Sequence, residues 1–386
     1  MNKKRVAIFR PGVISNGSAF EAMASIYKYI QKKYGWEFVV IKDEQDNYFD
    51  EEFDIITIPS ASRKTIPLVS FPRSYILFKK YVEYVLKDFD IILSSDPTIY
   101  DQGVLAAFVA NKYKIPLVYD ASLTTMGQSK GLKWKIRKRI AKWALYKSQI
   151  IWLTVPKTAE RFRDIGLSDP RISSQFVLMG HPVDINTFKP DEKMKNNDTK
   201  IILCVARLVL EKGVQYIIEA VAPILKNNSN VKLLIVGKGE AKPFLERIAI
   251  EEGISDKIEF IDPVPHKDLI KIYQSAHIFI GHPISISTWE EYFGVVNIEA
   301  MACGLPLVSS RSGGISYLIR EDEVACLVEE RDIIGITKSL KRLLFDQTFY
   351  KKLSENGRKY VCNKYSVEVI AEKYKYYLDK LLDKGE

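Results

Sequence analysis

Two glutamates, Glu291 and Glu299, lie in a stretch whose residue types could hold a phosphorylated ligand. Gly294 lies between them, close to where the sequence predicts the start of a helix over residues 297–303. A glycine there lets backbone N–H groups approach a ligand, and a helix N-terminus favours an anion such as phosphate. Glu299, further along the helix, could then reach hydroxyl groups beside that anion. The combination fits a molecule that carries both phosphate and hydroxyl groups, such as a nucleotide sugar.

Two cations add to this chemistry. Arg207 and Lys212 follow the strand predicted over residues 201–206 and precede the helix predicted over residues 214–225. Positive side chains just past a strand end and close to a helix start suit a diphosphate. The sequence therefore predicts that Arg207 and Lys212 bind a diphosphate.

The order of these elements resembles a known donor site. Glu291 begins a Glu-x7-Glu pattern that contains Glu-x-Phe-Gly, continues as Glu-Ala-Met-Ala-Cys-Gly-Leu-Pro and is followed by a Gly-Gly pair. In this order the elements resemble the donor site of retaining glycosyltransferases of the GT-B fold, most closely glycosyltransferase family 4 (glycosyl transferases group 1). The resemblance covers most of residues 170–370 and reaches the N-terminal half only as a general pattern.

The resemblance implies a role for each donor-site residue. Glu291 would hold the sugar hydroxyls and the phosphate together with the backbone N–H groups of the residues that follow it. Arg207 and Lys212 would bind the pyrophosphate and offset the charge of the leaving nucleotide, which makes a metal unnecessary. Glu299 would bind the ribose hydroxyls. The remaining donor-binding positions implied by the resemblance are Gly12, Val264, Phe293, Gly294 and Val295.

The implied reaction is that of a transferase in glycan biosynthesis. A hexose-type sugar would pass from a UDP- or GDP-sugar to an acceptor hydroxyl, with retention at the anomeric carbon and without a metal or other cofactor. No side chain is an obvious nucleophile, which fits the front-face mechanism proposed for this family. The expected acceptor is a glycan or a lipid-linked molecule, whereas the base, the sugar and the acceptor itself stay open.

The N-terminal half departs from the family pattern at one position. Family members often have Asp-x-His after the strand that we predict over residues 116–119, and the matching residues here are Asp120 and Ser122. The chain contains no histidine before His181, so no histidine of this half can be catalytic. We expect Asp96, Asp120 and Ser122 on the acceptor side, because ligands of parallel sheets bind beyond the carboxyl ends of the strands.

The length predicts two domains, since 386 residues exceed what one hydrophobic core normally supports. Strands alternate with helices, which indicates α/β units with parallel sheets. With the resemblance, we expect a GT-B architecture of two Rossmann-like, doubly wound domains facing across a cleft. The expected parts are an acceptor domain over residues 1–185, a donor domain over residues 186–365 and a helix over residues 366–386 that returns to the first domain.

Composition limits the possible partners. A chain with 47% hydrophobic and 27% charged residues reads as a globular protein, and its net charge of +9 favours an acidic partner. No zinc-finger spacing, aromatic RNA-binding motif or helix-turn-helix pattern supports nucleic acid. Arg10 and Pro11 end the first apolar run too early for a signal peptide, so we expect a cytoplasmic location. Cys204, Cys303, Cys326 and Cys362 lack metal-type spacing and are expected to be buried free thiols.

A basic segment lies between Asp120 and Glu160, which enclose nine basic residues and no acidic one. Most of them fall in or beside a helix predicted around residues 130–147 that also contains Trp134 and Trp143. One interpretation is a peripheral contact with an anionic membrane surface. The other is a solvated helix face whose apolar side packs on the domain.

Asp88-Phe89-Asp90 resembles the Asp-x-Asp metal motif of the other large glycosyltransferase fold. It precedes a predicted strand instead of following one, so capping of a turn is the favoured interpretation and no metal site is expected.

Two alternatives to a transferase stay open at this point. A nucleotide-sugar epimerase of the same fold would bind the donor but would need no acceptor. The other alternative is a non-catalytic subunit that binds nucleotide or membrane. The presence of Arg207, Lys212, Glu291 and Glu299 argues against this alternative.

Overall fold

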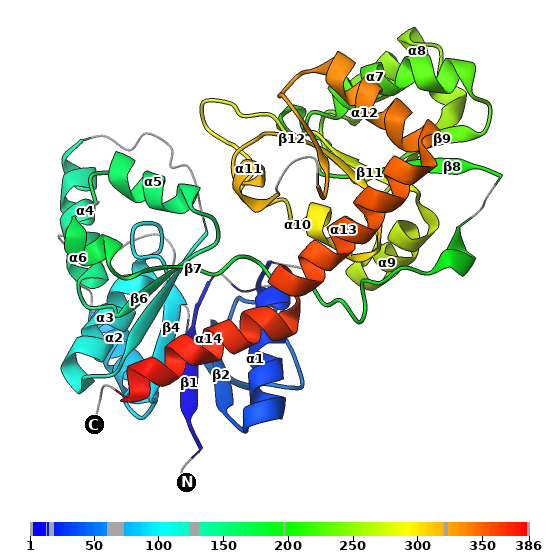
Figure 1. Cartoon of the computed structure of the whole chain (residues 1–386). Helices are drawn as coiled ribbons and strands as arrows, with labels where there is room; N and C mark the ends of the chain where they lie inside the picture. The colour runs from blue at the N-terminus through cyan, green and yellow to red at the C-terminus, as the bar shows by residue number, and fades with distance from the viewer. Residues whose placement is uncertain are drawn as a thin grey trace. The chain divides into compact units, whose positions relative to one another are not determined.

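The computed structural model describes residues 3–12, 14, 19–59, 73–122, 131–167, 169–195, 198–319 and 323–383. The chain divides into two compact units, of which unit 1 comprises residues 1–182 and 367–386 and unit 2 comprises residues 183–366 (Figure 1). Lys130, which we included in the basic segment, lies outside the described residues.

Unit 1 is built on a seven-stranded sheet in the order β3-β2-β1-β4-β5-β6-β7, in which every neighbouring pair is parallel. The strands are β1 (Arg5–Phe9), β2 (Glu37–Asp43), β3 (Asp54–Ile58), β4 (Ile91–Ser95), β5 (Leu117–Ala121), β6 (Ile150–Leu153) and β7 (Phe176–Leu178). The strand order changes direction between β1 and β4. In doubly wound sheets, ligands bind at such a switch point, beyond the carboxyl ends of the strands.

The helices of unit 1 cover this sheet. They are α1 (Ala19–Tyr34), α2 (Arg73–Leu86), α3 (Asp101–Tyr113), α4 (Leu132–Leu145), α5 (Lys157–Asp164), α6 (Pro170–Ser173) and α14 (Val367–Leu382). The final helix lies beside the first one (Figure 1). The rings of Tyr27 and Tyr374 pack edge to face with centroids 5.8 Å apart, and Lys33 forms an ion pair with Glu372 at 2.6 Å. The last helix therefore belongs to the first unit.

Unit 2 repeats the plan with six parallel strands in the order β10-β9-β8-β11-β12-β13. The strands are β8 (Lys200–Val205), β9 (Val231–Val236), β10 (Ile258–Ile261), β11 (Ile278–Gly281), β12 (Leu307–Ser310) and β13 (Cys326–Val328). The α-helices are α7 (Val214–Asn227), α8 (Lys242–Glu251), α9 (His266–Ser275), α10 (Val295–Ala302), α11 (Ile315–Leu318), α12 (Ile333–Phe345) and α13 (Gln347–Tyr365). The strand order changes direction between β8 and β11.

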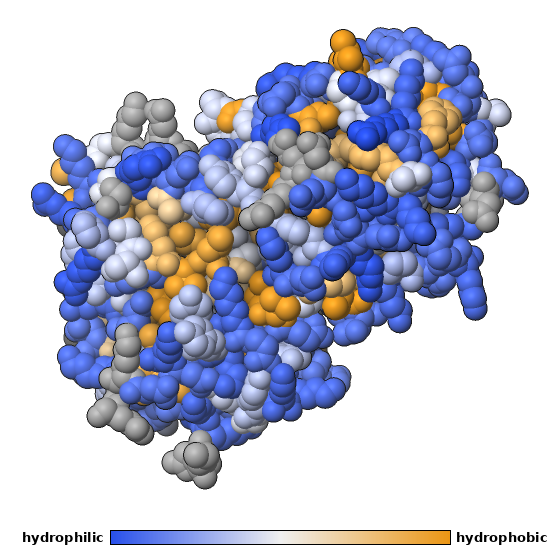
Figure 2. All heavy atoms as spheres, viewed as in Figure 1, coloured by the Kyte–Doolittle hydropathy of each residue, from blue (hydrophilic) through white to orange (hydrophobic). Residues whose placement is uncertain are grey.

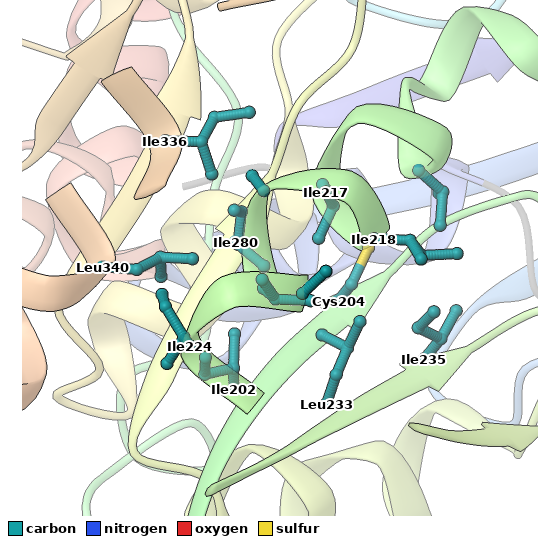
Figure 3. Close-up of a cluster of buried hydrophobic side chains, with 14 of the residues drawn as sticks. Ile202, Cys204, Ile217, Ile218, Ile224, Leu233, Ile235, Ile280, Ile336 and Leu340 are labelled. Carbon is teal, nitrogen blue, oxygen red and sulfur yellow. The ribbon is translucent and has the colours of Figure 1, made fainter. Parts of the chain in front are cut away.

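The core of unit 2 fills the space between the sheet and the helices that cover one face. Strand residues Ile202, Leu233 and Ile280 meet Ile217 of α7 and Leu340 of α12 (Figure 3). Burial of each such side chain stabilises the fold by about 1.5–3 kcal/mol. Strands covered on both faces read as continuous apolar runs, which is why these segments were predictable from the sequence.

On the outer face shown in Figure 2, hydrophilic side chains cover most of unit 2 and hydrophobic ones gather in patches. Among the described residues, no helix combines the length and the apolar character needed to cross a membrane.

The predicted fold class is confirmed, since both units are doubly wound parallel sheets of the Rossmann type. One helix start was predicted too late. The helix predicted over residues 297–303 begins at Val295, directly after Gly294, which favours the turn into the helix.

The structure also shows the surroundings of the four cysteines and of the Asp-x-Asp motif, for which no metal-binding role was predicted. All four cysteines are free, and burial raises the pKa of Cys204 and of Cys303 to about 12. Cys326 and Cys362 are half-buried, so the expectation of complete burial was wrong for these two. Asp90 accepts the backbone N–H of Arg5 at 2.6 Å, which ties a turn to the first strand.

Candidate functional site

Arg207 directly follows Ala206 at the end of β8, on the switch-point side of the unit 2 sheet. The turn after β9 holds this segment, because Leu208 N–H donates to the Lys238 carbonyl and Ala241 N–H donates to the Leu208 carbonyl, both at 2.9 Å. The Arg207 side chain is 64% exposed, and the nearest acid, Glu211, lies 4.0 Å away. The guanidinium group is thus open to an incoming anion.

Lys212 ends a short 3-10 turn and is followed by Gly213, the residue before α7. Gly213 adopts a φ of +66°, and a Cβ placed there would lie 1.8 Å from the His282 carbonyl oxygen. This close approach joins the start of α7 to the segment that follows β11. Within the described part of the chain, no side chain caps the N-terminus of α7.

Lys212 contacts the glutamate predicted to share its ligand. Its Nζ lies 2.5 Å from Glu291 Oε2, and the two side chains are 17% and 15% exposed. The same Nζ lies 4.6 Å from the centroid of the Trp289 ring. The structure therefore brings together three residues from two segments that lie far apart in the sequence.

Glu291 is held through its backbone by the Gly-Gly pair. Gly314 N–H donates to the Glu291 carbonyl at 2.7 Å. A Cβ on Gly313 would lie 2.1 Å from the same oxygen, so only glycine allows this contact. The pair thus positions the Glu291 backbone.

Gly294 has a φ of +74° and directly precedes α10, as a helix-entry glycine should. Val295 is the first residue of α10, and its N–H is one of those that a helix leaves without a partner in its own hydrogen-bond ladder. The Phe293 side chain is buried and packs edge to face on Tyr365, with centroids 5.6 Å apart. Any contact of Phe293 with a ligand would therefore be made by its backbone.

Glu299 lies in α10 and is only 6% exposed. Its Oε2 accepts from the Tyr273 hydroxyl at 2.9 Å, and its Oε1 lies 2.9 Å from His266 Nε2. Burial and the nearby Glu299 carboxylate raise the pKa of Tyr273 well above its usual value, which keeps the hydroxyl a donor. Half-buried Val264 precedes α9, so the segment expected to edge the base leads directly to His266.

In unit 1, Asp96 and Asp120 are neighbours at the carboxyl edge of the sheet, where Asp96 N–H donates to the Asp120 carbonyl at 3.1 Å. The Asp96 carboxylate is 2% exposed, pairs with Arg161 and accepts from the Thr98 hydroxyl at 2.6 Å. These contacts close Asp96 off from solvent. Its expected place on the acceptor side is not supported by this geometry, and Asp96 takes no part in the function proposed below.

Asp120 lies within β5 and pairs with Arg10, which directly follows β1. Both side chains keep some exposure, 12% for Arg10 and 17% for Asp120. Ser122 is exposed just after β5. This pair and the exposed serine give unit 1 a small polar surface at the strand ends.

Gly12 has a φ of +76°, and its N–H donates to the Asp46 carboxylate at 2.6 Å. The expected approach of a donor diphosphate to Gly12 would have to displace this carboxylate. The contacts of the other predicted donor residues, which lie in unit 2, support a donor site better than those of Gly12 do.

Comparison with known proteins agrees with the donor-site geometry. Residues 186–360 match the family model described as glycosyl transferases group 1. Over these residues the chain is therefore similar to group 1 glycosyltransferases. The matched residues include Arg207, Lys212, Glu291 and Glu299, the set that was predicted to bind a nucleotide sugar.

Curated relatives are similar to part of this chain. An uncharacterized glycosyltransferase of Methanocaldococcus jannaschii is 35% identical over 46% of this chain and 44% of its own length. The lipopolysaccharide core biosynthesis glycosyltransferase LpsE of Rhizobium meliloti is 28% identical over 57% of this chain and 61% of its own length. The chain thus spans about half the length of these curated relatives.

Solved structures show that the fold is shared over nearly the whole chain. HepE of Anabaena in complex with UDP superposes with a TM-score of 0.79 at 15% identity, over 98% of this chain and all of HepE. HepE in complex with UDP-glucose gives a TM-score of 0.74 at 16% identity over the same share of each chain. At this level of identity the likeness establishes the GT-B fold.

Three contacts of the predicted site residues were missed from the sequence. His266 at Glu299 was not considered because a lone histidine carries no motif. Trp289 was given no role, and Arg10 was considered only as the end of an apolar run. The position of Arg10 directly after the first strand was the one signal that could have identified it.

Among the described residues, no group of three or more histidine, cysteine or acidic side chains forms a cluster that could hold a metal ion.

Proposed function

We propose that this protein is a retaining glycosyltransferase that moves a hexose-type sugar from a UDP- or GDP-sugar to an acceptor hydroxyl. The observation that carries the proposal is the contact between Lys212 and Glu291 at 2.5 Å, beside Gly213 at the start of α7. A cation, an acid and a helix N-terminus here meet the needs of a sugar diphosphate, which presents phosphate and hydroxyl groups together.

The chain's own groups would act on charge and orientation. Lys212 and the exposed guanidinium of Arg207 would bind the diphosphate and stabilise the negative charge that grows as the bond to the anomeric carbon breaks. Glu291 would turn from Lys212 to the sugar hydroxyls. The acceptor oxygen would form its bond on the face that the diphosphate leaves, and the acceptor proton would pass to the leaving phosphate oxygen. This route needs neither a metal nor a side-chain nucleophile.

A thermal-shift panel tests the donor. It compares UDP, GDP and ADP and their common sugar conjugates. At about a hundred times its dissociation constant, a true ligand stabilises the folded protein by roughly 2.7 kcal/mol. UDP is the first candidate, because HepE, which shares the fold, has been crystallised with UDP and with UDP-glucose. A panel without any shift would contradict the proposal, and conversion of the sugar without an acceptor would indicate an epimerase.

Alanine variants test the roles of the residues. E291A and K212A should each lower the rate of transfer by at least about a hundredfold, since each removes a group that orients or stabilises the reacting diphosphate sugar. The matched control is K226A, because Lys226 and Glu252 form an exposed ion pair at 3.2 Å in the same unit. Unchanged transfer by E291A and K212A would remove both residues from the mechanism.

We also propose that the acceptor is a glycan or a lipid-linked molecule and that α4 contacts an anionic membrane surface. On this helix Leu132 is 73% exposed, and Lys133, Lys135 and Arg139 are exposed as well. By contrast, Arg137 donates to the Ile99 carbonyl at 2.6 Å, and Lys142 pairs with Asp169 at 2.9 Å. A lipopolysaccharide core enzyme among the relatives supports an acceptor of this class.

Vesicle sedimentation tests the membrane contact. The protein should bind vesicles that contain anionic phospholipid and not neutral ones, and the variant K133E/K135E/R139E should lose most of this binding. K351E/K352E is the control, because these two lysines are exposed on α13 of unit 2. If both variants bind equally well, α4 is a solvated helix face.

A further inference from the structure

A short hairpin directly precedes Glu291. Ile286 N–H donates to the Trp289 carbonyl at 2.8 Å, and Trp289 N–H donates back to Ile286 at 3.3 Å. The segment before it is bound to the Lys212 turn, since Ile284 N–H donates to the Glu211 carbonyl at 2.8 Å. One loop thus touches the turn twice, through its backbone at Glu211 and through two side chains at Lys212.

The Trp289 ring and the Glu291 carboxylate both contact the Lys212 ammonium group. The ring centroid lies 4.6 Å from Nζ, and the carboxylate oxygen lies 2.5 Å from it. A lysine ammonium is a point charge on a flexible stem, so it needs neighbours to hold it in one place. A carboxylate alone does not define the direction from which a ligand can approach, whereas a ring face closes one side.

Contact between a lysine and an aromatic ring is common in this chain, and most of these pairs contain no predicted donor-site residue. Lys79 lies 4.4 Å from the Phe108 ring, and Lys112 lies 5.2 Å from the Tyr113 ring. Lys112 also pairs with an acid, Glu83, but the acid that shares Lys212 with Trp289 is Glu291, a predicted donor-site residue. The Trp289 contact also differs in burial, since the Lys212 side chain is 17% exposed and that of Lys112 is 59% exposed. Partial removal from water strengthens the attraction between a cation and a ring.

We propose that Trp289 is a positioning residue that acts through Lys212, fixing the ammonium group for the donor diphosphate. This inference rests on the proposed function, because Lys212 is taken as the diphosphate ligand. When the diphosphate binds, Glu291 is released to the sugar, and the Trp289 ring keeps Lys212 in place. Trp289 then raises the affinity for the diphosphate without touching it.

A double-mutant cycle with UDP as the probe tests this role, or with GDP if the thermal-shift panel selects GDP. W289A should weaken UDP binding about fivefold, which corresponds to about 1 kcal/mol. In the K212A background the same substitution should change the affinity less than twofold. W289F should bind as the parent does, whereas W289L, which has no ring, should behave as W289A. If W289A does not fold, the cycle is measured with W289F and W289L in its place.

Additive effects of W289A and K212A would overturn the proposal, because Trp289 would then contact the nucleotide itself or act only on the fold. Loss of binding in W289F would overturn it as well, because that variant keeps the ring.

A ligand-free measurement separates this proposal from the proposed function. Trp289 is the only tryptophan in residues 183–366, so the difference between parent and W289F emission spectra isolates its fluorescence. K212A should change that difference spectrum, because it removes the cation from the ring, and K226A should not. An unchanged spectrum in K212A would overturn the Trp289 contact even if UDP binds. A changed spectrum without any UDP or GDP binding would support the contact and reject the donor site.

Discussion

The two switch points of this protein have the same topology, but the arginine at one is paired and mostly buried, whereas the arginine at the other is exposed. Arg10 follows β1 in unit 1, and Arg207 follows the equivalent strand β8 in unit 2. Arg10 is 12% exposed and paired with Asp120, whereas Arg207 is 64% exposed with its nearest acid 4.0 Å away. The strand end determines where a cation lies. The position of the nearest acid determines whether the cation is available to a ligand.

The ion pairs near the two sheet edges also differ in exposure, and again the pair in unit 1 is the more buried one. Asp96 and Arg161 of unit 1 are 2% and 1% exposed, and Lys212 and Glu291 of unit 2 are 17% and 15% exposed. A fully buried pair that loses one partner leaves an uncompensated charge in the protein interior. A partly exposed pair can exchange its partner for a ligand or for water. We therefore expect the first pair to hold the fold and the second to serve binding.

The largest expected effect comes from breaking the buried pair. R161M should lower the free energy of unfolding by about 3–5 kcal/mol, because the Asp96 carboxylate stays buried without its cation. Chemical denaturation followed by circular dichroism measures this loss. E83Q provides the comparison and should cost far less stability, because Glu83 pairs with Lys112, whose side chain is 59% exposed, and water screens such a pair.

K212A completes this comparison in unit 2. It should lower diphosphate affinity while costing much less stability than R161M, since Lys212 and Glu291 can both turn to water. Equal losses of stability in R161M and K212A would contradict the division into a structural pair and a binding pair.

The second effect tests the backbone that holds Glu291. In G313A the added Cβ would collide with the Glu291 carbonyl, so the glutamate must move. A displacement of about 1 Å at a catalytic group can lower the rate about a hundredfold. G253A is the matched control, because Gly253 also has a positive φ, of +61°, but a Cβ there meets nothing within 4 Å. Transfer rates and unfolding midpoints are measured for both variants.

Both variants share the backbone strain of a positive φ, but G313A adds the collision with the Glu291 carbonyl, so it should lose more stability than G253A, and only G313A should lose activity. Equal activities would show that the Gly-Gly pair serves the turn and has no influence on Glu291.

The same contrast explains what the sequence could predict. The donor stretch places Glu291, Gly294, Glu299 and the Gly-Gly pair within one continuous segment, so their spacing carried the information. The fold followed from apolar strands that alternate with amphipathic helices. In unit 1 the decisive partners are far apart, since 110 positions separate Arg10 from Asp120 and 65 separate Asp96 from Arg161. Such pairs form only because the strand order brings their segments together, and no local pattern records that order.

Trp289 and His266 were missed for a related reason. Each contacts a residue of the predicted donor site, but through a turn or a helix start whose direction no local pattern gives. The position of a backbone motif was thus predictable, and the side chains that surround it were not.

The smallest expected effect is the loss of stability at acidic pH that protonation of His282 causes. His282 directly follows β11 in unit 2, is fully buried and accepts the Arg331 N–H at 2.9 Å through Nε2. Burial lowers the pKa of His282 to about 4, and the nearby acids Glu330 and Asp332 offset only part of this shift. Between its unfolded pKa near 6.5 and its folded pKa, the unfolded state binds more protons, so stability falls as the pH falls. From pH 7 to pH 5 this loss should be about 2 kcal/mol.

H282Q keeps an acceptor for Arg331 but cannot be protonated, so its stability should change about 2 kcal/mol less over this range. Urea denaturation of both proteins at pH 7 and pH 5 measures the difference. In unit 1, hydrogen bonds from lysines lower the pKa values of Glu372 and Asp379, although burial opposes the shift, so these two groups take up no proton over this range. The acid effect of His282 should appear in the emission of Trp289, the only tryptophan of unit 2. If H282Q loses as much stability as the parent between pH 7 and pH 5, another group is responsible for the acid sensitivity and His282 does not distinguish the two sheet edges.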